Sequence, residues 1–316
     1  MIYDVIGDVH GKAMLLKKLL LKLGYHKSHS SGAYTARDRR AVFVGDLIDR
    51  GEEELETVTI VRKMVDDANA VCLLGNHEFN AVCYATEIPG NPGRYLRKHS
   101  AQNERSHSMF LKEFGDITSP LHRQWVDWFK TLPMWYRGFD FLTVHACFDP
   151  VSMTICRAAT DGTLCLEGAR KLRHLSSPRW EEGRAAQILL KGPDARLPFN
   201  LSFKDKSGNV RHKVRIRWWQ ARADNIYDDV ISIVCTDEER EFFKKMTPPW
   251  HRRNAPDPGC IVFIGHYWMP PYEEPRPLSP NVICTDYSAG IGGPLCAYSH
   301  ETGHEIELSR FTRVFP

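Results

Sequence analysis

The sequence predicts an α/β layered fold that begins with largely parallel strands. Near the start of the chain, a short apolar run ends three times in a polar, glycine-rich loop that is followed by a segment with helical spacing. Such strand–loop–helix units are typical of parallel strands joined by crossover helices. The chain has 316 residues, of which 42% are hydrophobic and 26% charged, so it can bury one large core, with or without an insertion.

The first unit combines a strand at 2–6 with a helix at 12–23, whose apolar residues recur at helical spacing. Two glycines frame the sharp turn between them, and this turn contains Asp8 and His10. The polar stretch 27–40 that follows is expected to form a loop or an irregular hairpin.

The second unit is a strand at 41–44, a loop at 45–51 and a helix at about 53–67. The third is a strand at 70–74, the stretch Gly-Asn-His-Glu at 75–78 and a further helix. Ligands of open α/β sheets collect outside the carboxyl ends of the strands. We therefore expect the chemistry of this protein at the three strand ends.

The rest of the chain is less regular. Expected elements are a surface excursion at 88–108, a helix with a buried aromatic face at 120–131, and strands at 139–144, 260–264, 282–285 and within 295–311. Segment 151–255 lacks the strand–loop–helix rhythm. A turn signal at 205–208, between 201–203 and 214–219, predicts a hairpin-bearing insertion or cap in which Arg215 and Arg217 point to the same side of a strand.

Charge and cysteine content exclude several classes of protein. A net charge of +3 is too small to indicate a nucleic-acid or membrane partner. Two basic clusters, at 94–105 and 244–253, are possible contacts for an anionic substrate, although a solvated surface is the commoner explanation. The nine scattered cysteines contain no Cys-x-x-Cys pair and suit a reducing compartment. Because no leader and no apolar run of ~20 residues is visible, we expect a soluble, cytoplasmic protein.

Six candidate metal ligands lie at or just after apolar runs: Asp8, His10, Asp46, Asn76, His145 and His266. Oxygen and imidazole donors without thiolates suit divalent ions such as Mn, Fe or Zn. Six ligands exceed one tetrahedral site but suit two metals that share one carboxylate. Such a pair, ~3.5–4 Å apart, attracts phosphate and activates a bridging water.

Three motifs in this order carry a resemblance to a known family: Gly-Asp-Val-His-Gly at 7–11, Gly-Asp-Leu-Ile-Asp-Arg-Gly at 45–51 and Gly-Asn-His-Glu at 75–78. Together with His145 and His266, they resemble the calcineurin-like metallophosphoesterases. The resemblance is strongest to the branch of PPP-type serine/threonine phosphatases and bis(5'-nucleosyl)-tetraphosphatases. It implies one metallophosphoesterase domain over 1–316, a β-sandwich flanked by helices, with a mixed α+β insertion at about 151–255.

The resemblance also implies a role for each matching residue. Asp8 and His10 would hold the first metal, Asp46 would bridge, and Asn76, His145 and His266 would hold the second. His77 would be the general acid, oriented by Asp49, since a His–Asp pair fixes the tautomer of the imidazole. Arg50 would bind phosphate oxygens through its guanidinium, and Arg215 or Arg217 is the candidate for a second phosphate-binding arginine.

Taken singly, each of these residues has a simpler explanation. Asp8 and Asp46 could be helix N-caps, His145 or His266 a satisfied core histidine, and Arg50 a surface ion-pair partner. The ordered set outweighs these explanations. The chain also departs from its relatives, with Cys147 where many have Gly and with Asp-Tyr-Ser at 286–288 where many have Asp-Thr-Gly.

Three functions are compatible with this sequence. The first expectation is hydrolysis of phosphate monoesters, on a phosphoprotein or a small molecule, by attack of a metal-bridging hydroxide. The alternative is a dinucleoside polyphosphate hydrolase of the diadenosine tetraphosphate type. A non-catalytic scaffold is disfavoured because the acid and all six ligands are present. The expected cofactors are two divalent ions, with Mn first and Fe, Zn, Ni or Mg as alternatives. The sequence leaves the oligomeric state open and gives nucleic acid little support as a substrate.

Overall fold

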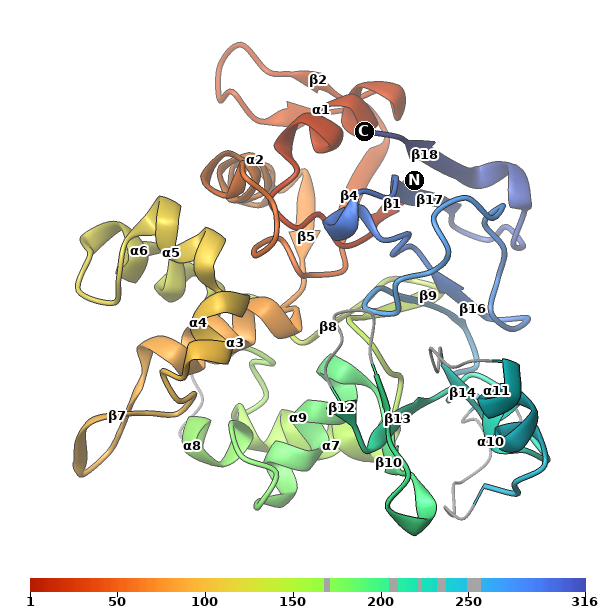
Figure 1. Ribbon diagram of the computed structural model, residues 1–316. Coiled ribbons are helices and arrows are strands. Elements are labelled where there is room, and N and C mark those ends of the chain that lie inside the picture. Colours follow the sequence, from red (N-terminus) through yellow and green to blue (C-terminus); the bar gives the residue numbers. More distant parts are fainter. Residues whose placement is uncertain (168–170, 205–209, 221–222, 232–236, 249–256) are drawn as a thin grey trace.

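The structure is a computed structural model that describes residues 1–167, 171–204, 210–220, 223–231, 237–248 and 257–316. Two sheets form its centre (Figure 1). The first has the order β18-β17-β1-β4-β5 and consists of β1 (Ile2–Ile6), β4 (Arg39–Phe43), β5 (Ala70–Cys72), β17 (Leu295–Glu301) and β18 (Phe311–Val314). Strands β1, β4 and β5 are parallel, as predicted, and β17 runs antiparallel to β1 and β18.

The second sheet has the order β16-β15-β9-β8. Its strands are β8 (Trp135–Arg137), β9 (Phe141–Val144), β15 (Ile261–Ile264) and β16 (Val282–Cys284). The last three are parallel, and β8 pairs antiparallel with β9. The strand expected from residue 139 begins only at Phe141, since Phe139 is 86% exposed.

The side chains of each strand point alternately to the two faces of its sheet, which explains why the two sheets pack together. Val5 and Val42 of the first sheet contact Phe141 and Phe263 of the second in one buried cluster. Their neighbour Phe43 faces the opposite side and joins the cluster that the helices cover. This confirms the predicted β-sandwich flanked by helices.

Helices before residue 131 cover the outer face of the first sheet and the region beyond β5 (Figure 1). They are α1 (Ala13–Lys22), α2 (Glu54–Asp66), α3 (Asn76–Ala85), α4 (Ala101–Ser106), α5 (Ser108–Phe114) and α6 (Pro120–Lys130). The aromatic face of α6 is buried, which confirms its assignment to the core. The stretch 27–40, predicted as a loop or an irregular hairpin, contains most of the hairpin β2 (His26–Lys27)/β3 (Tyr34–Thr35). The predicted surface excursion at 88–108 contains most of the hairpin β6 (Glu87–Ile88)/β7 (Asn91–Tyr95) and helix α4.

The region after residue 150 mixes helices with short strands. Its elements are α7 (Pro150–Ala159), α8 (Leu172–Leu175), α9 (Glu181–Lys191), β10 (Asp194–Arg196), β11 (Phe203–Lys204), β12 (Val210–Arg211), β13 (Lys213–Ile216), α10 (Ile226–Asp229), β14 (Val230–Ile231) and α11 (Asp237–Lys244). Short 3-10 turns lie at Pro198–Asn200, Ala289–Ile291 and Leu308–Arg310. Helices α7 and α9 pack on the main core, whereas β13 contributes to a separate small cluster. The division of the chain into a domain and an insertion stays a prediction.

The predicted hairpin between 201–203 and 214–219 has different partners in the structure. Phe203 pairs with Arg211, whereas β13 pairs with β10 on one side and β14 on the other. The turn signal at 205–208 lies outside the described residues. Strand β13 ends at Ile216, so Arg217 does not share a strand face with Arg215 as expected.

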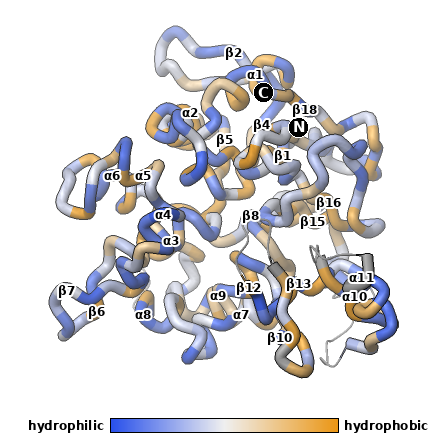
Figure 2. The backbone as a smooth tube through the Cα atoms, viewed as in Figure 1, coloured by the Kyte–Doolittle hydropathy of each residue, from blue (hydrophilic) through white to orange (hydrophobic). Residues whose placement is uncertain are grey.

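Hydropathy along the chain agrees with this layering. Apolar stretches concentrate in the central strands, whereas the peripheral hairpins β2/β3 and β6/β7 are mostly polar (Figure 2). Among the helices of the described residues, none has both the length and the apolar character needed to cross a membrane.

Candidate metal centre

Loops from both sheets meet beside the carboxyl ends of their parallel strands. The six candidate ligands come from five of these loops: Asp8 and His10 after β1, Asp46 after β4, Asn76 after β5, His145 after β9 and His266 after β15. Five of the six are at most 6% exposed, and His266 is partly buried. The backbone N–H of His266 donates to Oδ2 of Asp8 at 3.1 Å. Residues separated by more than 250 positions in the chain thus share one site.

Several residues of these loops have strained backbones. His10, Asp46, Asp49 and His266 have φ values of 49°, 51°, 68° and 69°, in the left-handed region that non-glycine residues rarely adopt. Such conformations persist where the surrounding structure holds them, and they concentrate at functional sites.

Two glycines allow the loops after β4 and β5 to touch. A Cβ on Gly45 would lie 2.5 Å from the backbone N of Gly75, and a Cβ on Gly75 would lie 2.2 Å from that of Asp46. The buried carboxylate of Glu78 joins the same loops, because it accepts N–H hydrogen bonds from Asp46, Leu47 and Gly75 at 2.8–3.0 Å. Gly45, Gly75 and Glu78 therefore hold the loops of the two motifs in contact.

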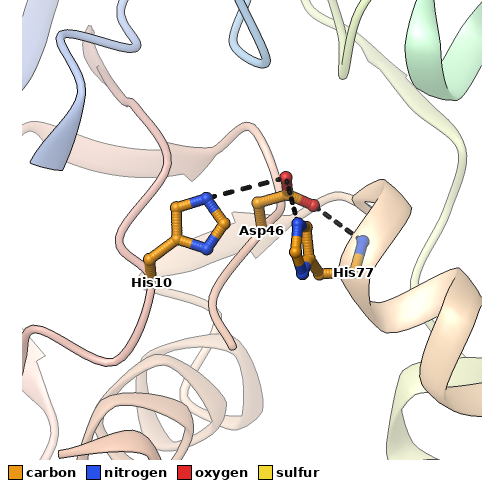
Figure 3. Close-up of side chains that lie close together, drawn as sticks. All are labelled: His10, Asp46 and His77. Atoms are coloured by element: carbon orange, nitrogen blue, oxygen red, sulfur yellow. Dashed lines mark hydrogen bonds and ion pairs between the residues drawn. The ribbon is translucent and has the colours of Figure 1, made fainter. Parts of the chain in front are cut away.

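Asp46 lies at the centre of the site. Its Oδ2 is 3.4 Å from Nε2 of His145 and 3.9 Å from Nε2 of both His10 and His77. Figure 3 shows His10 and His77 on either side of this carboxylate. Ligand atoms of His10, Asp46 and His77 lie within 4.8 Å of one another, as do those of Asp46, His145 and His266. We name these sets the first and the second group; Asp46 belongs to both.

The hydrogen bonds of the histidines leave lone pairs directed at this centre. Nδ1 of His10 donates to the carbonyl of Ile48, and Nδ1 of His145 donates to that of Val44, each at 2.8 Å. The Nε2 atoms of both are buried and have no hydrogen-bond partner in the described part of the protein, and the same holds for Oδ1 of Asn76. Metal-binding histidines use one nitrogen in this way to orient the other.

Charge at the centre also favours cations. Burial, followed by the charges of Asp286 and Asp46, raises the pKa of Asp8 well above its usual value. Burial opposes a charge on His145, but the Asp46 carboxylate raises its pKa to about 10. Burial lowers the pKa of His10 to about 3, so its lone pair stays available. Clustered carboxylates and imidazoles suit one or two divalent ions, which would stabilise the ionised carboxylates and take the place of the proton on His145. The residues therefore fit the metals that the sequence led us to expect.

His77, a member of the first group, is held by the carboxylate of Asp49. Its Nδ1 donates to Oδ2 of Asp49 at 2.5 Å, which directs Nε2 toward Asp46. The second oxygen of Asp49 accepts a hydrogen bond from Nδ1 of His107 at 2.8 Å. Burial disfavours the protonated form of His77, but Asp46 and Asp49 raise its pKa above the usual value. The geometry suits a proton donor.

The candidate phosphate-binding arginines lie in different surroundings. Arg50 is exposed, and its guanidinium covers the ring of Trp268 at 4.1 Å. Gly290 packs closely on both Arg50 and His10 of the first group. Arg215 is half-buried near the second group, where burial and then the charges of His145 and Arg215 lower the pKa of His266. The backbone N–H of Arg217 donates to Asp229.

Sequence reasoning assigned no role to Glu78 and His107, and it noted Asp286 only within a departure from the relatives. Glu78 ties two loops together, His107 holds Asp49, and Asp286 accepts from the backbone N–H groups of Trp268 and Ser288. Glu78 could have been found, because an acidic residue three positions after a helix N-cap is a capping signal. His107 lies in a segment without periodicity, and no signal in the sequence points to it.

Comparisons with known proteins agree with the geometry. The family model described as "Calcineurin-like phosphoesterase" matches residues 1–267. Over 149 residues, 46% of this chain and 56% of the relative, the chain is 28% identical to bis(5'-nucleosyl)-tetraphosphatase PrpE (asymmetrical) of Bacillus velezensis. Over 146 residues, 46% of this chain and 42% of the relative, it is 29% identical to the symmetrical bis(5'-nucleosyl)-tetraphosphatase of Methylococcus capsulatus.

The match thus spans only about half of the length of these two curated relatives. Among solved structures, a protein serine/threonine phosphatase from Saccharomyces cerevisiae aligns with a TM-score of 0.47 at 13% identity. The alignment covers 99% of this chain and 79% of the phosphatase.

Proposed function

The chain belongs to the calcineurin-like phosphoesterase family, and from this premise we propose that it is a hydrolase that cleaves dinucleoside polyphosphates at a centre of two divalent ions. The observation that carries the hydrolytic chemistry is Asp46, whose carboxylate is shared by two groups of histidines. The names of the curated relatives support the substrate. This reverses the order in which the sequence alone ranked the two substrate classes.

The metal ligands are assigned as the sequence implied. Asp8 and His10 would hold one ion, Asn76, His145 and His266 the other, and Asp46 both. The pair would supply Lewis acidity toward phosphate oxygens and lower the pKa of water. Oxygen and imidazole donors suit Mn, Fe or Zn, and manganese is the ion that we propose first.

His77 serves as the general acid in this proposal. When water attacks phosphorus and the bond to the leaving oxygen breaks, Nε2 of His77 gives its proton to that oxygen. Asp49 accepts the Nδ1–H of His77 and so fixes the tautomer and stabilises the protonated ring. His107 positions Asp49 from the other side. Arg50 binds oxygens of the attacked phosphate through its guanidinium.

Phosphate monoesters, on a small molecule or a phosphorylated protein, are the second candidate substrates. The observation that favours them is the exposure of Arg50 beside the first group, which leaves room for a substrate that carries one phosphate.

Product analysis of the Mn-loaded protein tests the proposed function. Diadenosine tetraphosphate, p-nitrophenyl phosphate and a phosphoserine peptide are incubated in parallel, with chelator-treated protein as the control, and nucleotides are separated by chromatography. We expect the dinucleotide to yield ATP and AMP, or two ADP. Phosphate from the monoesters with the dinucleotide intact would support the second candidate instead. Failure of all three reactions with metal bound would contradict both.

A further inference from the structure

Three half-buried basic side chains lie near the second group or against α3, the helix that begins with Asn76. Lys191 is the last residue of α9, Arg97 follows β7, and Arg215 lies in β13. In the described part of the chain, none of the three forms an ion pair. Arg97 donates to Oδ1 of Asn80 at 2.8 Å and Arg215 to the carbonyl of Gly192 at 3.1 Å, both neutral acceptors. We call these three residues the basic cluster.

The end of α9 is fixed against the metal centre. The backbone N–H of Ala146, next to His145, donates to the carbonyl of Leu189 at 2.9 Å. Gly192 packs so closely on Tyr267, the neighbour of His266, that a Cβ would lie 2.2 Å from its hydroxyl oxygen. Lys191, between these two contacts, is therefore held beside two ligands of the second group.

Arg97 is held against α3, the helix that begins with Asn76, because its guanidinium donates to Oδ1 of Asn80 and its backbone N–H donates to the carbonyl of Cys83. The charges of the three members act on one another. Burial, followed by the charges of Arg97 and Arg215, lowers the pKa of Lys191 to about 8. Asp46 acts on Lys191 in the opposite direction, as expected for a residue near the centre. Half-buried like charges repel one another, so an anion bound among them would relieve the repulsion.

Arg50 belongs to a different part of the site. A Cβ on Gly290 would lie 2.6 Å from Cδ2 of His10 and 2.8 Å from Cδ of Arg50, so Arg50 is next to the first group. A phosphate at the metals can thus contact Arg50 while a second, covalently linked phosphate extends toward the basic cluster. A monoester has no group for the second position.

We propose that Lys191, Arg97 and Arg215 form a subsite for the phosphate groups that are linked to the attacked phosphate, and that this subsite selects phosphoanhydride chains over monoesters. The inference rests on the proposed function for the position of the attacked phosphate. It assigns the selection of substrate to three residues that belong to none of the motifs, of which only Arg215 was a candidate for phosphate binding from the sequence.

Calorimetry with two inorganic probes tests the subsite without relying on turnover. Tripolyphosphate and orthophosphate are titrated into the Mn-loaded protein at a fixed free Mn²⁺ concentration, and the same titrations into buffer are subtracted. Orthophosphate occupies one phosphate position, whereas tripolyphosphate reaches the second. We expect tripolyphosphate to bind at least about tenfold more tightly than orthophosphate, since each charge-assisted contact adds affinity.

Variants assign the difference to the cluster. Lys191→Met and, independently, Arg97→Gln should each weaken tripolyphosphate about tenfold while changing orthophosphate less than about threefold. The matched control Lys98→Met replaces an exposed neighbour of Arg97 and should change neither. Circular dichroism and metal content show whether a variant is folded. If Lys191→Met does not fold, the result for Arg97→Gln decides.

Two results would overturn the subsite: equal affinities of the wild-type protein for the two probes, or an equal loss for both probes in the variants. If tripolyphosphate binds as expected but diadenosine tetraphosphate is not cleaved, the subsite stands and the proposed function fails. If the dinucleotide is cleaved but the variants leave tripolyphosphate binding unchanged, the proposed function stands and the subsite fails.

Discussion

Two regions of the molecule contribute to the same site in different ways. The strand-end loops (residues 7–11, 45–51 and 75–78) are almost wholly buried and are held by close glycine contacts and by the Glu78 carboxylate. The later segment, residues 181–231 as far as the structure describes it, presents half-buried cations and has a small apolar cluster of its own around Val214. The comparison indicates that the candidate ligands are held by the sandwich, whereas two of the three residues of the proposed subsite, Lys191 and Arg215, come from a segment packed beside it.

Asp46→Asn should have the largest effect on the strand-end loops. Loss of the shared anion leaves both groups without a bridging carboxylate, so we expect depleted metal content and a loss of turnover of more than about 100-fold. Elemental analysis after dialysis measures the occupancy, and Asp66→Asn, at an exposed position of α2, is the control. Full occupancy in Asp46→Asn would remove its proposed bridging role.

His77→Ala separates acid catalysis from metal binding within the same loops. The variant should keep both metals but lose about 10²–10⁴-fold in turnover on substrates with poor leaving groups, because these need a proton at the leaving oxygen. His26→Ala, at an exposed position of β2, should have no effect. Steady-state rates on an alkyl phosphate and on p-nitrophenyl phosphate measure the difference. Full activity on the alkyl phosphate would show that the acid lies elsewhere.

Glu54→Gln tests how pH affects the stability of the fold at the start of α2. Glu54 is buried, and neither carboxylate oxygen has a hydrogen-bond partner among the described residues. Burial, followed by the charges of Asp49 and Glu113, raises its pKa to about 9 from an ordinary value of 4.5. The folded protein therefore keeps this proton between pH 4.5 and 9 while the unfolded chain loses it, and stability falls as pH rises through this range.

The Gln variant lacks this loss, so its stability relative to the wild type should grow with pH, by at most about 1.4 kcal/mol for each pH unit. Urea unfolding of the chelator-treated proteins at several pH values measures the trend. Glu56→Gln, on an exposed side of the same helix, should show no such growth. A difference between Glu54→Gln and wild type that is independent of pH would contradict the assignment.

A valine-to-alanine substitution in each of the two regions compares their stabilities directly. Val214 lies in the small cluster and Val42 between the two sheets, and both are nearly inaccessible. Val214→Ala should lower the free energy of local opening around it by about 2 kcal/mol. Amide exchange in β10, β13 and β14 should therefore become faster, with metal content unchanged. Val42→Ala should lower the global free energy of unfolding. If Val214→Ala accelerated exchange in β1 and β4 equally, the two regions would form one cooperative unit.

Much of the sandwich could be predicted because its signals are local. Apolar runs at 2–6, 41–44 and 70–74 become parallel strands, and the helices after them begin and end within a few residues of the predicted limits. Short strands in segment 151–255 were harder to predict. There, β13 pairs with β10 and β14, partners that depend on packing, while the turn at 205–208 suggested a different hairpin.

By itself, the sequence determined which side chains follow the strands, and with them the types of the candidate ligands, while the resemblance to a family implied the His77–Asp49 pair. Tertiary structure alone decided that loops of two different sheets meet, that His107 holds Asp49, and that Lys191 lies beside the second group. The physical reason is the range of the interactions. Turn geometry and strand alternation act between near neighbours, whereas the pairing of distant buried polar groups follows from how the sheets and helices pack.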